Sequence, residues 1–265
     1  MQKLVLDMFD KYLSDDGRGI RYESLARSRG FKEYVLQASN LRREGLLEDI
    51  ASLAADERMA VFLNLYNSMV VHGTLAVPPG PSAADARGPF FSGKSGVNYN
   101  IGGQHFSLDD IEHAVLRGSP EWDARSFKKN DPRRIVTIPR SQFDPRIHFA
   151  LNCGAKSCPP IKLYSADNLD KGLALATQAF CESEVQVDLL ARSVRLSKIL
   201  FWYCRDFSGK EEVDNIAMLR KLTLLLPPEI EPAVSLLRLL EAADAGEEVS
   251  VLFSEYDWSR NEEQS

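Results

Sequence analysis

Several features that commonly reveal a protein's role are missing from this chain of 265 residues. It has no apolar run approaching the roughly 20 residues that a membrane-spanning helix needs. Its first residues are amphipathic and acidic, without the apolar core and small-residue cleavage site of a signal peptide. The sequence therefore predicts an intracellular, cytoplasmic protein without a membrane span.

An excess of basic residues is also missing. The formal net charge is −6, with 32 Lys and Arg residues against 38 Asp and Glu residues. Short basic runs at residues 128–129 and 133–134 are diluted by Asp123 and Asp131, which is typical of a solvated loop. Because phosphate backbones require a basic surface, nucleic acid is excluded as the main partner. A protein or peptide partner is expected instead.

Cysteine is scarce, and cofactor motifs are absent. The four cysteines, Cys153, Cys158, Cys181 and Cys204, have irregular spacings, which predicts thiols in a reducing compartment. The pair of glycines at residues 102–103 does not make a phosphate-binding loop, and no Gly-x-Ser-x-Gly elbow is present. No cofactor is therefore expected.

The chain does contain enough apolar material for a folded core, with 44% hydrophobic and 26% charged residues. Residues 55–72 predict a buried helix, because their apolar side chains leave almost no polar face, and Gly73 is expected to end it. Ser107 and Asp110 have the spacing of a reciprocal cap at the start of another helix. Further helices are predicted at residues 4–13, 31–41, 46–53, 165–180, 200–206, 213–226 and 231–243.

Short strands are predicted between these helices. Hairpins are expected at residues 97–106 and 185–197, strands at 134–138, 147–151 and 249–253, a surface loop at 77–96 with its tip near 79–85, and a disordered tail at 261–265. The prediction is an α+β fold, a helix-rich single domain around a small, mostly antiparallel sheet. This domain covers residues 1–265, with a helical N-terminal part at 1–75, a mixed core at 97–200 and a helical C-terminal part at 200–260.

Four segments in a fixed order carry a family resemblance. They are residues 60–67 (Ala-Val-Phe-Leu-Asn-Leu-Tyr-Asn), 107–113 (Ser-Leu-Asp-Asp-Ile-Glu-His), 144–159 (Asp-Pro-Arg-Ile-His-Phe-Ala-Leu-Asn-Cys-Gly-Ala-Lys-Ser-Cys-Pro) and 256–261 (Tyr-Asp-Trp-Ser-Arg-Asn). Across about residues 31–261 the chain resembles the uncharacterised family called domain of unknown function 547. The resemblance implies no settled activity, and it implies a distant relation to papain-like thiol hydrolases.

The stretch from His148 to Cys158 has the highest density of reactive groups. In a regular strand, His148 and Cys153 point to opposite faces, so Cys153 is expected to be a buried small hydrophobe. Cys158 follows Gly154 in a proline-flanked loop, where Lys156 and His148 favour a thiolate. The leading hypothesis is therefore a thiol-dependent hydrolase or transferase with Cys158 as its nucleophile.

Such a hydrolase also needs a base and an orienting group. His148 or His113 is the candidate base, and Asn67 or Glu112 the orienting group. Glu112 is expected to orient a histidine other than His113, because neighbouring helix residues point about 100° apart. Asn64 and Asn67 share one face of the buried helix, where they make either a structural polar network or the wall of a site.

Three alternatives remain open. A non-catalytic protein-interaction module requires only that the motifs stabilise the fold. A zinc site would use His113, His148, Cys153 and Cys158, although their spacing is unusual and no metal is expected under the leading hypothesis. A redox pair of Cys153 and Cys158 lacks the Cys-x-x-Cys spacing of thioredoxin-type sites.

Overall fold

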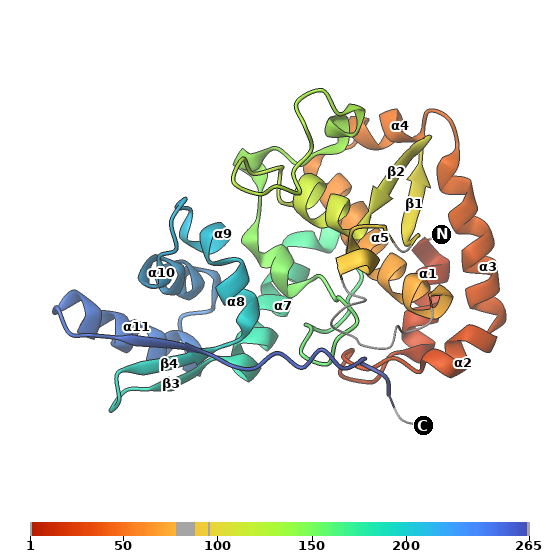
Figure 1. Cartoon of the computed structure of the whole chain (residues 1–265). Coiled ribbons are helices and arrows are strands. Elements are labelled where there is room, and N and C mark those ends of the chain that lie inside the picture. Colours follow the sequence, from red (N-terminus) through yellow and green to blue (C-terminus); the bar gives the residue numbers. More distant parts are fainter. Residues whose placement is uncertain (1, 78–87, 95, 264–265) are drawn as a thin grey trace. The chain divides into compact units, whose positions relative to one another are not determined.

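A computed structural model describes residues 2–77, 88–94 and 96–263 of the chain (Figure 1). These residues divide into two compact units. The first unit comprises residues 1–147, 151–169 and 258–265, and the second comprises residues 148–150 and 170–257. The first unit is therefore completed by a segment near the end of the chain. The predicted loop tip at residues 79–85 lies outside the described residues.

Helices and short helical turns make up most of the first unit. Its elements are α1 (Gln2–Tyr12), α2 (Tyr22–Arg27), α3 (Arg29–Ala38), η1 (Ser39–Arg42), α4 (Leu46–Ser52), α5 (Ala55–Ala76), β1 (Asn98–Ile101), β2 (Gln104–Ser107), η2 (Asp110–Leu116), η3 (Pro132–Val136), η4 (Arg140–Gln142) and η6 (Ala166–Asn168). The turn η5 (Pro145–Phe149) contains residues of both units.

The second unit combines helices with a three-stranded sheet. Its elements are α7 (Leu169–Glu184), β3 (Gln186–Asp188), β4 (Ser193–Leu196), α8 (Lys198–Trp202), α9 (Cys204–Ser208), α10 (Asn215–Leu225), α11 (Glu231–Asp244) and β5 (Ser250–Phe253). One hydrophobic cluster from these helices and from β4 forms its core, and it includes Cys181 and Cys204. Both cysteines are thus core residues of helices.

The helix α5 is the buried helix that its sequence predicts. Phe62, Leu63 and Met69 have no exposed surface, and the carboxylate of Glu57 accepts the amide of Ala54 at the first turn. The predicted end at Gly73 is wrong, since the helix continues to Ala76. A Cβ atom at position 73 would lie 2.7 Å from a methyl group of Val97, so this glycine permits close packing.

Two predicted strands are 3-10 turns instead. Residues 134–138 contribute to η3, and residues 147–151 to η5. Each turn begins with Asp-Pro-Arg, in which the carboxylate of Asp131 or Asp144 accepts the amide two residues later. This local hydrogen bond and the proline favour a turn, whereas a short apolar run alone does not distinguish strand from helix.

The fold is α+β and rich in helix, as predicted, and its strands form two small sheets. β1 and β2 make the predicted antiparallel hairpin, which turns at Gly102 and Gly103 with positive φ angles. In the second sheet β3 and β4 make the other predicted hairpin, and β5 joins β4 in parallel. Within the part of the chain that the structure covers, no helix has the length and apolar character that crossing a bilayer requires.

Candidate functional site

The segment Asn152–Cys158, here called the cysteine loop, is attached to α5 through an amide side chain. Asn67 Oδ1 accepts the backbone amide of Asn152 at 2.9 Å, and both residues are buried. The Asn152 side chain then accepts the amide of Gly154 and donates to the carbonyl of Pro159, each at 2.8 Å. Asn67 therefore holds the backbone at the start of the loop, which is the structural alternative for this predicted site residue.

The other amide of the α5 pair has the same kind of role. Asn64 donates to the carbonyl of Tyr164 at 2.7 Å and accepts the amide of that residue at 3.0 Å. Both α5 amides thus bond to the backbone of segments that follow far along the chain. They form the structural polar network that is one of the two predictions for this pair, the other being the wall of a site.

A segment near the end of the chain covers the cysteine loop. Ala155 pairs with Arg260 in an antiparallel bridge, and the amide of Asn261 donates to the carbonyl of Gly154 at 3.0 Å. The side chain of Asn261 accepts the Tyr22 hydroxyl at 2.8 Å and is 3% exposed. The predicted disordered tail is therefore wrong for residues 261–263, because the amides of Asn261 and Glu263 donate to the carbonyls of Gly154 and Ile20. Residues 264–265 lie outside the described residues.

The two cysteines of the loop have the reverse of their predicted environments. Cys158 is 1% exposed, and its sulfur accepts the backbone amide of Cys153 at 3.0 Å. Cys153, expected to be buried, is partly exposed. The prediction failed because residues 147–153 form no strand: His148 and Phe149 are both buried, so burial does not alternate.

The predicted cap of Ser107 and Asp110 is present at the start of η2. The Asp110 carboxylate accepts the amide of Ser107 at 2.9 Å, and the Ser107 hydroxyl accepts the amide of Asp110 at 3.1 Å. The element that follows is a π-helix, in which the amide of Arg117 donates to the carbonyl of Glu112 at 3.0 Å. π-Helices are rare in proteins, and those that occur often lie at functional sites.

This π-helix brings Glu112 and His113 close together. Glu112 Oε1 lies 3.7 Å from His113 Nε2, although the sequence predicted that these neighbours point apart. The prediction assumed α-helical winding, and the wider turn of a π-helix changes the angle between successive side chains. Asp109 Oδ1 lies 3.8 Å from the same nitrogen, and the Tyr66 hydroxyl donates to Glu112 Oε2 at 3.0 Å.

Asp123 supplies the strongest charge contacts of this cluster. Its carboxylate lies 3.1 Å from His113 Nδ1 and also pairs with Arg117 and Arg125. Burial alone would raise the pKa of Asp123, but hydrogen bonds from His113 and Arg125 outweigh it and hold that pKa well below its ordinary value. Burial raises the pKa of Asp109. Two predicted site residues, Glu112 and His113, thus belong to one buried ion cluster.

His148, the other candidate base, belongs to the second unit. Its Nε2 lies 2.9 Å from Asp206 Oδ2, and its ring stacks on Tyr203 with the centroids 3.7 Å apart. It is 3% exposed. Cys158 belongs to the first unit.

The four proposed zinc ligands make no metal site in the described part of the chain. Among those residues no group of three or more His, Cys, Asp or Glu side chains could hold a metal ion. Two of the carboxylates near His113 are themselves paired, Asp123 with arginines and Glu112 with the Tyr66 hydroxyl.

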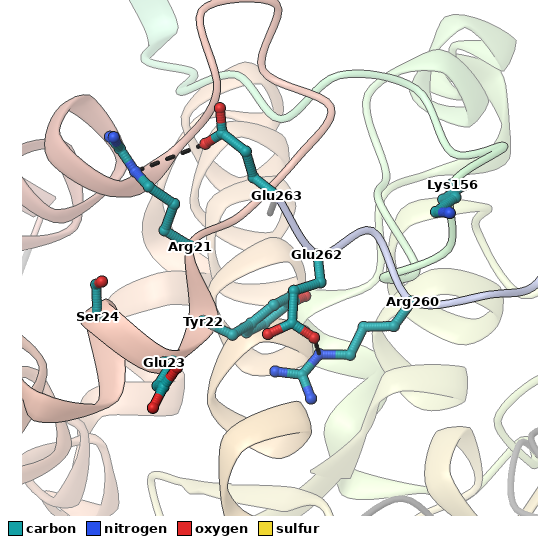
Figure 2. Close-up of a pocket in the computed structure, with 8 residues that line it drawn as sticks. All are labelled: Arg21, Tyr22, Glu23, Ser24, Lys156, Arg260, Glu262 and Glu263. Atoms are coloured by element: carbon teal, nitrogen blue, oxygen red, sulfur yellow. Dashed lines mark ion pairs between the residues drawn. The ribbon is translucent and has the colours of Figure 1, made fainter. Parts of the chain in front are cut away.

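A pocket of about 450 Å³ lies beside the cysteine loop (Figure 2). Three segments line it: residues 21–24, Lys156 of the loop, and residues 260–263. The lining residues are Arg21, Tyr22, Glu23, Ser24, Lys156, Arg260, Glu262 and Glu263. None of them was predicted as a site residue, although residues 156 and 260 lie within the segments that carry the family resemblance.

The charges of the pocket are only loosely paired. Arg21 Nε lies 3.6 Å from Glu263 Oε2, and Arg260 Nε lies 3.7 Å from Glu262 Oε2. Both distances exceed that of a hydrogen bond, and both nitrogens are buried without a hydrogen bond to any described residue. The guanidinium carbon of Arg260 lies 4.0 Å from the centre of the Tyr22 ring, which fixes its position.

Comparison with known proteins gives one match. The family model described as "Protein of unknown function, DUF547" matches residues 50–181, a range that contains all five predicted site residues but not the motif at residues 256–261. No curated protein and no solved structure matches the chain. Through residues 50–181, the chain belongs to the DUF547 family.

Proposed function

We propose that this domain is a binding module whose pocket takes an anionic ligand bearing a carboxylate or phosphate group. One observation carries the proposal: two buried guanidinium nitrogens, Arg21 Nε and Arg260 Nε, make no hydrogen bond to a described residue at the edge of this pocket. Buried donors are nearly always paired, and the carboxylate oxygens nearest to these two lie beyond hydrogen-bond distance, so both donors favour an additional acceptor.

The charges of the lining favour an anion as that acceptor. Arg260 is held over Tyr22 with its guanidinium at the pocket, and Arg guanidinium groups bind carboxylate and phosphate oxygens through paired donors. Lys156 is exposed, and its ammonium has no ion-pair partner among the residues that the structure describes. Glu23 is already paired with Arg27 outside the pocket. Glu263 Oε2 is likewise buried without a hydrogen bond and lies nearest to Arg21, so Arg260 and Lys156 are the donors left for a ligand.

The size of the pocket limits the ligand. Its volume of about 450 Å³ falls within the range of roughly 300–1,000 Å³ that small-molecule sites occupy. A small dicarboxylate, a phosphate or an acidic peptide end fits a pocket of this size. A folded partner protein would contact the pocket only through such a group.

Calorimetric titration with inorganic phosphate and with succinate tests the proposal. We expect saturable binding of at least one anion, weakened at least tenfold by Lys156→Gln and by Arg260→Gln, because each removes one charged donor. Arg238→Gln, an exposed arginine of the second unit, is the matched control and should bind as the original chain does. Equal binding by neutral succinamide, or unchanged binding by both pocket variants, contradicts the proposal.

A thiol-dependent hydrolase or transferase is the second candidate, and one observation favours it. The amide of Cys153 donates to Cys158 Sγ at 3.0 Å, and a donor at sulfur stabilises a thiolate. In that mechanism Cys158 is the nucleophile, His148 or His113 the base, and Asn67 or Glu112 the orienting group. The 1% exposure of Cys158 makes it the weaker candidate, because a nucleophile must reach its substrate.

Alkylation by iodoacetamide at neutral pH separates the two candidates. For a binding module we expect Cys158 to be alkylated at least tenfold more slowly in the folded chain than in chain unfolded by guanidinium, as burial predicts. Mass spectrometry of the peptide that contains Cys158 gives the rate, and Cys181, which is fully buried, serves as the internal reference. Alkylation faster than in the unfolded chain would favour the thiol enzyme.

A further inference from the structure

We propose that Cys153 and Cys158 form a dithiol that oxidises reversibly to an intramolecular disulfide. This inference goes beyond ligand binding at the pocket, and it assigns a redox modification to the cysteine loop. It rests on the contact between the two cysteines and on the contrast in their exposure, and not on the spacing of a known redox motif.

The loop already brings the two residues into contact. Cys158 Sγ lies 3.0 Å from the backbone nitrogen of Cys153, so the Cα atom of Cys153 lies within about 4.5 Å of that sulfur. The loop is held in this turn by the positive φ of Gly154 and by the bond from the Cys158 amide to the Ala155 carbonyl at 3.1 Å. Rotation of the Cys153 side chain is then the main movement that a bond between the sulfurs requires.

The exposure of the two thiols gives each a different role. Cys153 is partly exposed and accessible to an oxidant, whereas Cys158 is 1% exposed and accessible to Cys153. Cys181 and Cys204 provide a contrast, since both are buried in the core of the second unit. Burial also raises the pKa of the Cys181 thiol, which disfavours its thiolate.

A small-molecule disulfide such as oxidised glutathione is the oxidant in this scheme. The Cys153 thiolate attacks one glutathione sulfur, which forms a mixed disulfide and releases one glutathione thiolate. Cys158 loses its proton and attacks the Cys153 sulfur, which forms the intramolecular bond and releases the second glutathione thiolate. The protein loses two electrons and two protons, and the oxidised glutathione gains both.

Tryptic digestion makes the product easy to identify. Trypsin cleaves after Arg146, Lys156 and Lys162, so Cys153 and Cys158 fall into two different peptides, residues 147–156 and 157–162. After equilibration of the folded chain in glutathione buffers of increasing oxidised fraction and quenching with N-ethylmaleimide, we expect these peptides to be joined by a disulfide. Reduction with excess glutathione before quenching should separate them.

Comparison with unfolded chain shows whether the fold favours the bond. We expect the ratio of disulfide to dithiol at a fixed glutathione ratio to be at least tenfold higher in the folded chain than in guanidinium. Cys181→Ser should behave as the original chain, whereas Cys158→Ser should leave a glutathione adduct on Cys153. A ratio no higher in the folded chain, or a stable glutathione adduct on Cys153 of the original chain, overturns the proposal. Anion binding by the reduced Cys153→Ser variant is measured separately, so failure of either proposal leaves the other intact.

Discussion

Replacing Asp123 by alanine is expected to lower the free energy of unfolding by about 3–5 kcal/mol, because the change leaves the buried Arg117 guanidinium without its carboxylate and removes a contact of the buried His113 ring. The side chains of Asp123, Arg117 and His113 are 7%, 5% and 2% exposed, so water cannot replace the lost partner. Urea unfolding followed by circular dichroism measures the difference. Asp244→Ala removes an exposed Asp–Arg pair, with Arg220, and should cost at most about 1 kcal/mol.

The effect of this substitution should also depend on pH. The pKa of Asp123 is lower in the folded chain than in the unfolded chain, where an aspartate titrates near pH 3.9. Its contribution is therefore complete above about pH 5, and it declines as the pH falls below about 4 toward the folded value. The difference between the original chain and Asp123→Ala should shrink over that acidic range, and a constant difference from pH 7 to pH 3 contradicts this account of the cluster.

Asn261→Ala is the second substitution with a large expected effect, about 2–3 kcal/mol of unfolding free energy. Asn261 accepts the buried Tyr22 hydroxyl at 2.8 Å and donates to the Arg18 carbonyl at 2.9 Å, so its truncation removes both bonds from a position that is 3% exposed. The same change loosens the segment that carries Arg260 and Glu262, and we therefore expect weaker anion binding in the calorimetric titration as well.

An exposed asparagine provides the control for this second substitution. Asn130→Ala should change the free energy of unfolding by no more than about 0.5 kcal/mol, as is usual for surface positions. If Asn261→Ala is as mild as Asn130→Ala, the segment at residues 259–263 does not hold the cysteine loop in solution, and the pocket loses one of its three sides.

Elements with strong local signals were predictable from the sequence. The Ser107 and Asp110 cap, the hairpin turning at residues 102–103, and the buried helix α5 each depend on residues close together in the chain. Local propensity and capping determine such elements, with little contribution from tertiary contacts. The predicted strands at residues 134–138 and 147–151 are wrong because the Asp-Pro-Arg that precedes each forms a local turn, which the apolar run that follows does not reveal.

The candidate site was harder to predict, because its parts come from distant segments. Asn67 was recognised as a residue with a structural or functional role, but its partner Asn152 lies 85 positions later. The pocket joins Arg21, Lys156 and Arg260, and no periodic pattern relates such positions. The segment at residues 256–261, one of the four that carry the resemblance, is the sequence signal nearest to the pocket, and its residues Arg260 and Asn261 bond to the cysteine loop.

The closing of the first unit by residues 258–263 bears on the order in which the chain is made. Ribosomes deliver a protein from its N-terminus, so all residues of the second unit leave the ribosome before Asn261 does. Until then Tyr22 and Gly154 lack the groups that bond to them in the folded protein. A nascent chain that stops before residue 259 therefore contains every residue of the second unit, whereas the first unit still lacks residues 259–263.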